Sequence, residues 1–215
     1  MRPLTEQETK VLFEKLANYT SDLKPLIAPL SDASDADRYV FRLIKDRVYY
    51  VLLSIANLAT SVARDNLASV GICLGKFTKV RPQLVSNLGL KSRRKPNRLQ
   101  TQANVPAQTL KFRLHITALP ILAAHARYKI WIKPNGVMPF LYGSHISKAH
   151  VGRWTEDCPS NVGVIVYDMS DNPIGFGVSA RSTAEARRLD PTGIVVFRQA
   201  DCGEYLRDED TLFAG

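Results

Sequence analysis

The spacing of apolar positions predicts a helix at the start of the chain and a pair of strands after it. Thr5 stands three residues before Glu8, which is the arrangement of a helix-capping box, and apolar residues then recur at helical spacing between positions 11 and 19. Two runs rich in β-branched and aromatic residues follow at positions 38–44 and 47–51, and the two residues between them suit a hairpin turn. The chain therefore begins with a helix beside an antiparallel sheet.

The next part of the chain predicts a second helix and a third strand. Ile55, Leu58 and Val62 have the spacing of the apolar face of an amphipathic helix. The run LASVGICLGKFTK that follows has strand character, and its glycines mark positions where a bend or a bulge is expected.

Strand signals return at residue 111 and dominate the second half of the chain. In KFRLHITAL the apolar positions share one face, and Arg113 and His115 are expected on the other. A short helix or helical turn is predicted at residues 140–152, and a short helix is predicted behind a second capping box at residues 182–185. Further strands are predicted at YKIWIK, VGVIVYD, IGFGVSA and GIVVFRQA. We therefore predict an α+β fold in which a helix-flanked antiparallel sheet is followed by a small mixed β-barrel.

Residues 80–108 interrupt this pattern. The segment has no apolar period, contains several turn-forming residues, and carries six Lys or Arg and no Asp or Glu. Because the net charge of the whole chain is +9, these six charges are two thirds of it. An inference from total charge to a polyanionic partner therefore depends on this one segment.

Composition sets broad limits on the class of protein. A chain of 215 residues with 45% hydrophobic content suits one large domain or two small ones. Apolar runs are too short for a membrane span and the first residues are polar, so we expect a soluble, intracellular protein with no membrane partner. Cys73, Cys158 and Cys202 are far apart and the four histidines lack ligand spacing, so we expect buried free thiols, no metal and no cofactor.

Six stretches of the sequence resemble a known family. They are MRPLTEQET, KDRVYYV, GKFTK, KFRLHITAL, FLYGSHISK and IVVFRQADCGEYLR. In this order they are similar to the eukaryotic 60S ribosome biogenesis factor family Nip-seven, whose members have an α/β domain followed by a PUA domain, an RNA-binding module. The resemblance implies an α/β domain at residues 1–126 and a PUA domain at residues 127–215.

The resemblance also implies a function. Members of the family are non-enzymatic assembly factors that bind precursor ribosomal RNA during 60S subunit biogenesis and pre-rRNA processing. The expected partners are precursor rRNA and other pre-60S assembly factors, including an rRNA methyltransferase. We expect a monomer within a larger complex, located in the nucleus and nucleolus.

The basic segment at residues 80–108 falls outside this resemblance, because in the family GKFTK continues directly into a stretch like TLKFRLHITAL. The segment has 29 residues, begins with a Val codon, which starts GT, and ends with Gln, which CAG can encode. Ala103 and Asn104 can be encoded as GCTAAC, a branch-site sequence. We therefore favour a retained intron. The alternative is a genuine disordered surface loop, in which KSRRKPNR is a nuclear-import or nucleic-acid patch.

One motif raises the possibility of catalysis. Residues 189–191 read Leu-Asp-Pro, the tripeptide that supplies the nucleophilic aspartate of pseudouridine synthases. Asp190 lies late in the chain and follows two arginines rather than glycine, so a turn before Pro191 is the simpler interpretation. We predict no catalytic residues. The alternative is an RNA-modifying enzyme or enzyme subunit with a PUA targeting domain, which a deep polar pocket within residues 1–126 would favour.

RNA of irregular structure is bound by phosphate contacts from Lys and Arg and by stacking of bases on aromatic or guanidinium planes. The resemblance places the RNA face of the PUA domain at residues 141–152 and 175–182. The candidate RNA-binding residues are Lys133, Tyr142, His145, Lys148, Arg153, Arg181, Arg187 and Arg188. Acidic residues gather near the end of the chain, where we expect an edge free for a protein partner: Glu204, Asp208, Glu209 and Asp210.

Overall fold

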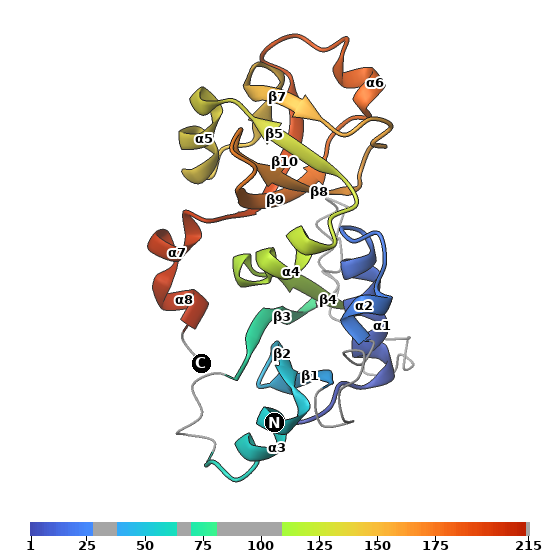
Figure 1. Cartoon of the computed structure of the whole chain (residues 1–215), viewed down its shortest axis with the longest axis vertical. Coiled ribbons are helices and arrows are strands. Elements are labelled where there is room, and N and C mark those ends of the chain that lie inside the picture. Colours follow the sequence, from blue (N-terminus) through green and yellow to red (C-terminus); the bar gives the residue numbers. More distant parts are fainter. Residues whose placement is uncertain (28–37, 64–69, 81–108, 214–215) are drawn as a thin grey trace, which may run out of the picture.

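The computed structural model describes residues 1–27, 38–63, 70–80 and 109–213 and contains two sheets placed one above the other along the long axis (Figure 1). The first sheet is antiparallel, in the order β1-β2-β3-β4. The second has the order β6-β10-β9-β8-β5-β7, with β5 and β8 parallel. An α+β fold with a helix-flanked antiparallel sheet and a mixed, barrel-like sheet is thus confirmed. The strands of the first sheet are Tyr39–Ile44 (β1), Arg47–Leu52 (β2), Ile72–Val80 (β3) and Thr109–Leu114 (β4).

The local signals at the start of the chain hold in the structure. Helix α1 (Glu6–Ala17) begins with the capping box of Thr5 and Glu8 and buries Leu12 and Leu16 against the first sheet. A short helix α2 (Lys24–Ile27) follows. Strands β1 and β2 form the predicted hairpin, which turns at Lys45, whose φ of 53° is a left-handed conformation. The predicted helix and hairpin are confirmed.

The predicted apolar face of the second helix is wrong. Helix α3 (Leu53–Ala59) is shorter than expected, and Ile55 and Leu58 are 50% and 72% exposed. The buried side chains are instead Ala56 and Ala59, which pack in a small cluster with Val51 of β2. Because α3 starts directly after β2, its backbone runs close to the sheet, and alanines allow this close approach.

Strands β3 and β4 lie on either side of the basic segment. The register between β2 and β3 shifts beside Gly75, so the predicted bulge is confirmed. Val80, which we assigned to the segment, instead ends β3, because its backbone pairs with Thr109 of β4. Residues 81–108 lie outside the described part of the chain, so both interpretations of the segment stay predictions.

The second sheet is curved, and one short segment connects its two edge strands. The 3-10 helix η4 (Lys148–His150) connects the edge strands β6 and β7. Within residues 140–152 the structure has the end of helix α5 (Pro134–Leu141), which begins earlier with a proline at its first position, and the helical turn η4, but no helix over the whole stretch. Helix α6 (Thr183–Ala186) has the predicted capping box. The strands are Lys129–Ile132 (β5), Ile146–Ser147 (β6), Val151–Trp154 (β7), Gly163–Tyr167 (β8), Pro173–Ser179 (β9) and Ile194–Asp201 (β10).

One hydrophobic core joins the two sheets. Tyr19, which follows α1, packs edge-on against Phe176 of β9 with the ring centroids 5.4 Å apart. A Cβ atom added to Gly163 of β8 would lie only 2.5 Å from the Tyr19 ring, so a larger residue there would separate the two parts. The backbone N–H of Gly163 also donates a 3.1 Å hydrogen bond to the carbonyl oxygen of Asn18 across this junction. The α4 helix (Leu119–Ala124) adds Leu119 and Leu122 to the same core.

Two short helices at the end of the chain return to the first sheet. They are α7 (Glu204–Arg207) and α8 (Glu209–Phe213), and they run from the end of β10 down beside β3 (Figure 1). Leu212 is buried, and its carbonyl oxygen accepts a hydrogen bond from the Arg47 guanidinium of β2. The sequence pattern did not predict these helices, because each is only about one turn long.

The strand predicted through residue 119 ends at Leu114, and His115, expected on the outer face, is buried. Burial first, and then the positive charges of Arg47, Lys76 and Arg113, lower the pKa of His115 from 6.5 to about 4.

This shift predicts a pH-dependent stability. Between pH 6.5 and 4 the unfolded chain binds a proton at this histidine while the folded chain does not. The contribution of neutral His115 to the free energy of unfolding is therefore fully present above pH 6.5 and decreases as the pH falls toward 4. The decrease is about 1–2 kcal/mol after allowance for solvent screening. Denaturant unfolding of His115→Gln across this range is expected to show a flatter pH dependence than the unmodified chain. His125→Gln is the matched control, and equal slopes for both variants contradict the assignment.

Candidate nucleic-acid interface

Three of the predicted RNA-binding cations line one pocket in the second sheet. Lys133 precedes α5, Lys148 begins η4 and Arg187 follows α6, so three separate segments bring them together. The pocket has a volume of about 400 Å³. The rest of its lining is mainly apolar, formed by Val151, Trp154, Thr183, Ala186 and Val195. An apolar pocket with cations at its rim can accept an unstacked base while the cations contact its phosphate.

Lys148 also has a structural role. Its ammonium donates a 2.7 Å hydrogen bond to the carbonyl oxygen of Arg187 and a second hydrogen bond to that of Leu189. These carbonyls belong to the turn that follows α6, so Lys148 fixes this turn against η4. The positive charge stays at the rim of the pocket, but its position is set by the protein.

The predicted aromatic residues lie beyond the other end of α5. Tyr142, the C-terminal cap of this helix, has 74% of its surface exposed. His145 packs edge-on against Phe197 of β10, with the ring centroids 5.4 Å apart. Phe197 is itself exposed, and sequence reasoning missed it, because burial along β10 does not alternate: Val195 and Val196 before it are both buried. We name Tyr142, His145 and Phe197 the aromatic cluster.

The remaining predicted residues do not join the pocket. Arg153 of β7 stacks over the Trp131 ring at 4.1 Å and forms an exposed ion pair with Asp171. Arg181 and Arg188 are exposed next to α6 and do not line the pocket. The structure thus brings together Lys133, Lys148 and Arg187, and leaves the other three arginines as separate surface charges.

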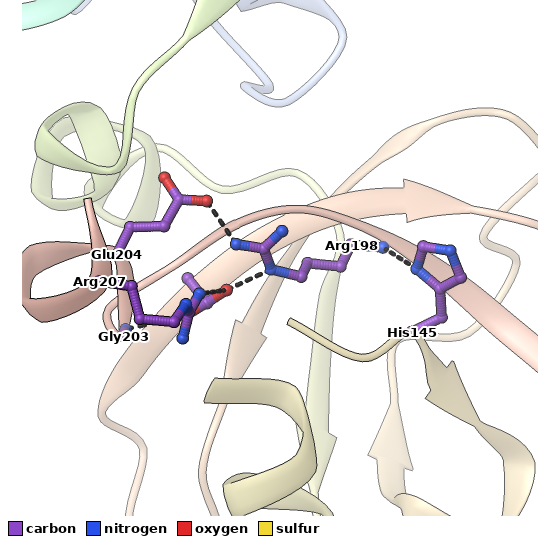
Figure 2. Close-up of polar contacts among 6 residues, drawn as sticks. His145, Arg198, Gly203, Glu204 and Arg207 are labelled. Atoms are coloured by element: carbon purple, nitrogen blue, oxygen red, sulfur yellow. Dashed lines mark hydrogen bonds and ion pairs between the residues drawn. The ribbon is translucent and has the colours of Figure 1, made fainter. Parts of the chain in front are cut away.

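A buried ion network connects the aromatic cluster to the end of the chain. The backbone N–H of Arg198 donates to Nδ1 of His145 at 3.3 Å, and the Arg198 guanidinium pairs with Asp201 and with Glu204, the latter at 2.5 Å (Figure 2). Arg207 pairs with Asp201 at 3.0 Å. The side chain of Asp201 is fully buried, and burial raises the pKa of Glu204 although Arg198 acts to lower it. The network therefore holds α7 against β10.

This network corrects the expectation of a free acidic edge. Glu204 is buried and paired with Arg198, so it is not available to a partner. Together with Asp208 it lines a pocket that also contains Lys76 and Arg113 of the first sheet. The sequence could not show this, because the cations that face these carboxylates come from strands far away in the chain.

The described residues offer little for catalysis. Asp190 is exposed in a turn, where its carbonyl oxygen accepts a hydrogen bond from the Gly193 N–H. The largest pocket beside α1, of about 620 Å³, is lined by a single carboxylate, that of Glu14, and one side of it is formed by β4. Within the described ranges no group of three His, Cys, Asp or Glu side chains could hold a metal ion. No helix in this part of the chain is long and apolar enough to cross a membrane.

Comparison with known proteins identifies the family. Residues 1–88 match the family model described as the NIP7/UPF0113 pre-PUA domain, and residues 128–210 match the UPF0113 PUA domain. The 60S ribosome subunit biogenesis protein NIP7 of Saccharomyces cerevisiae is 58% identical over 213 residues, which cover 99% of each chain. The chain belongs to the NIP7 family. The family resemblance found in the sequence is thus confirmed.

Other members and one solved structure agree with this assignment. The NIP7 protein of Schizosaccharomyces pombe is 56% identical, covering 99% of this chain and 100% of its own, and the Xenopus tropicalis homologue is 48% identical with 99% of each chain covered. A PUA domain protein from Aeropyrum pernix K1, solved as a tartrate complex, covers 95% of this chain and 87% of its own with a TM-score of 0.50 and 12% identity. This last similarity concerns the fold alone.

Proposed function

We propose that this chain is a 60S ribosome assembly factor that binds precursor ribosomal RNA through its PUA domain. The observation that carries the proposal is the pocket to which Lys133, Lys148 and Arg187 converge over an apolar floor. A phosphate can contact the cations at the rim while an unstacked base packs on the apolar floor, as in recognition of single-stranded RNA. Tyr142 and His145 offer a second place for a base to stack.

The role is non-enzymatic. The alternative, an RNA-modifying enzyme, needs a nucleophile or a general base in a cleft that admits a flipped nucleotide. In the described part of the chain the only candidate nucleophile with a family motif, Asp190, lies in an exposed turn. The pocket beside α1 has one carboxylate, that of Glu14, and therefore lacks a pair of carboxyl groups that could share acid and base roles.

The proposal includes the cellular context. The chain works in the nucleus and nucleolus as a monomer within a larger assembly, where its other partners are pre-60S factors including an rRNA methyltransferase. Residues 1–126 form the α/β domain that contacts these factors, and residues 127–215 form the PUA domain. The names of the relatives, all 60S subunit biogenesis proteins, support this context.

The test is the salt dependence of binding to a single-stranded oligouridylate. The double variant Lys133→Ala/Arg187→Ala is expected to bind more weakly and to reduce the slope of log affinity against log salt by about 1.4, or about 0.7 for each lost phosphate contact. Tyr142→Ala is expected to cost about 1–3 kcal/mol with the slope unchanged, because stacking releases no counterions.

The matched control removes two exposed lysines from α1 and α2. Lys10→Ala/Lys24→Ala changes the net charge equally but leaves the PUA domain intact. If this control and the pocket variant lose the same affinity, total charge determines binding and the pocket does not hold RNA.

A further inference from the structure

A row of like charges crosses the first sheet. Arg47 of β2 is paired directly with Lys76 of β3, and Lys76 is paired directly with Arg113 of β4. Directly opposed residues project from the same face of a sheet, with neighbouring strands about 4.8 Å apart. Like charges in this position destabilise the sheet, so the row needs a negative partner.

The rest of this face carries further cations among apolar residues. The four strands contain no Asp or Glu. Their apolar side chains, such as Leu43, Val48 and Phe112, point to the core on the side of α1. Five lysines and arginines lie on the opposite side, which they share with Tyr49 and Val51 of β2, both buried. We call this side the cationic face and define it by Arg42, Arg47, Lys76, Lys111 and Arg113.

Acidic residues of the chain itself lie at one end of the cationic face. Glu204 and Asp208 line a pocket of about 310 Å³ together with Lys76 and Arg113. Arg113 also acts to lower the pKa of Glu204, against the larger effect of burial, and Arg47 is hydrogen-bonded to α8 through the Leu212 carbonyl. The end of the chain thus places carboxylates where the row requires negative charge.

The carboxylates of α7 and α8 do not form ion pairs with every cation of the row. Of the ion pairs between described residues, none includes Lys76 or Arg113, and both side chains are exposed. The positive field at this site also acts on His115, whose pKa it helps to lower. The cationic face therefore keeps free capacity for a further anion.

We propose that the cationic face binds the phosphate backbone of RNA and that the acidic helices α7 and α8 compete with RNA for part of it. This second contact lies outside the PUA domain, and it relies on the proposed function only in that the partner is RNA. A protein partner would need apolar anchors at the centre of its interface. Of the exposed large apolar residues of these strands, Tyr39 stacks on Tyr50, and Ile72 is the strand partner of Tyr50, so both lie on the core side of the sheet.

The first test removes the charges of the row from the full chain. Lys76→Gln/Arg113→Gln is expected to reduce the slope of log affinity against log salt for a single-stranded oligouridylate by about 1.4. Lys10→Gln/Lys24→Gln is the control of equal charge and is expected to have a smaller effect on the slope. Circular dichroism and thermal unfolding establish that both variants remain folded. An unchanged slope in a folded row variant overturns the proposal.

The second test removes the competing acids. Asp208→Asn/Glu209→Gln/Asp210→Asn is expected to increase the affinity for the same RNA several-fold, because RNA no longer competes with carboxylates for the row. Glu156→Gln/Asp157→Asn/Asp190→Asn, at exposed turns of the PUA domain, removes the same three charges and is the control for a general effect of charge. The gain is expected to disappear when Lys76→Gln/Arg113→Gln is already present. Additive effects in this double-mutant cycle overturn the competition.

The outcomes separate this proposal from the PUA pocket and from a protein partner. If Lys133→Ala/Arg187→Ala weakens RNA binding and the row variant does not, the proposed function stands and the second contact fails. The reverse result supports the second contact and removes the pocket. If the row variant loses binding to a polyglutamate peptide but keeps its affinity for RNA, the cationic face receives an acidic protein segment and the RNA proposal is overturned.

Discussion

Replacing Arg198 with methionine is expected to lower the free energy of unfolding by about 3 kcal/mol, because the change leaves buried carboxylates without their counter-charge. Methionine keeps the apolar stem, so the loss reports the missing guanidinium. Asp201 still has Arg207, but Glu204 loses its ion-pair partner while its side chain is only 7% exposed. We therefore place the cost at the lower end of the range for breaking a buried pair. Urea unfolding monitored by circular dichroism measures it.

Two further variants identify the cause of this loss. Arg198→Met/Glu204→Gln is expected to recover part of the stability, because the second change removes the unpaired charge. Arg153→Met breaks the exposed pair with Asp171, whose two side chains are 59% and 69% exposed, and is expected to cost less than about 1 kcal/mol. If Glu204→Gln recovers nothing in the Arg198→Met background, packing rather than charge explains the loss.

Local signals predicted the elements that are set by a few neighbouring residues. Both capping boxes begin helices at the expected residues, because a side chain of the N-cap and a carboxylate three residues later satisfy each other's backbone donors. The β1–β2 hairpin and the bulge at Gly75 followed from turn chemistry in the same way. These features depend on only a few consecutive residues, so the sequence was sufficient.

Features that depend on distant neighbours were not predicted correctly. Periodicity indicated helix α3 but not which side packs, and the sheet contacts its alanines rather than Ile55 and Leu58. Helix α5 contains Gly136 and Pro139, which read as helix breakers. The structure explains Gly136, because a side chain there would collide with His150 of η4 and only glycine allows this contact.

The candidate site shows the same limit. Residue type and the family resemblance selected eight positions, and the structure brings three of them, Lys133, Lys148 and Arg187, to one pocket. No spacing rule could indicate that the Lys148 ammonium binds carbonyl oxygens of the segment that carries Arg187. Arg198 is not among the eight, although it is the centre of a buried network, because its partners are identified only once α7 lies against β10.

Joining Lys79 directly to Thr109 is expected to leave the fold intact and to remove most of the non-specific affinity for RNA. Strands β3 and β4 are already paired up to Val80 and Thr109, so after removal of residues 80–108 the two strands need only a tight hairpin turn between them. With Thr78 and Lys111 as the last pair, the loop has three residues, a common hairpin length. A shorter connection also lowers the entropy cost of closing the loop, so stability is expected to be equal or higher.

The loss of RNA affinity in this shortened chain follows from the charge count. The deleted segment carries six positive charges, and if all six contact phosphates the salt slope falls by about 4. The PUA pocket and the cationic face remain, so binding that is weaker and less dependent on salt is expected to persist, and Lys133→Ala/Arg187→Ala then has a larger relative effect. A shortened chain that unfolds contradicts the prediction. Sequencing of the messenger RNA between the Lys79 and Thr109 codons separates the two origins of the segment, because a transcript that joins these codons identifies a retained intron and its absence identifies a genuine loop.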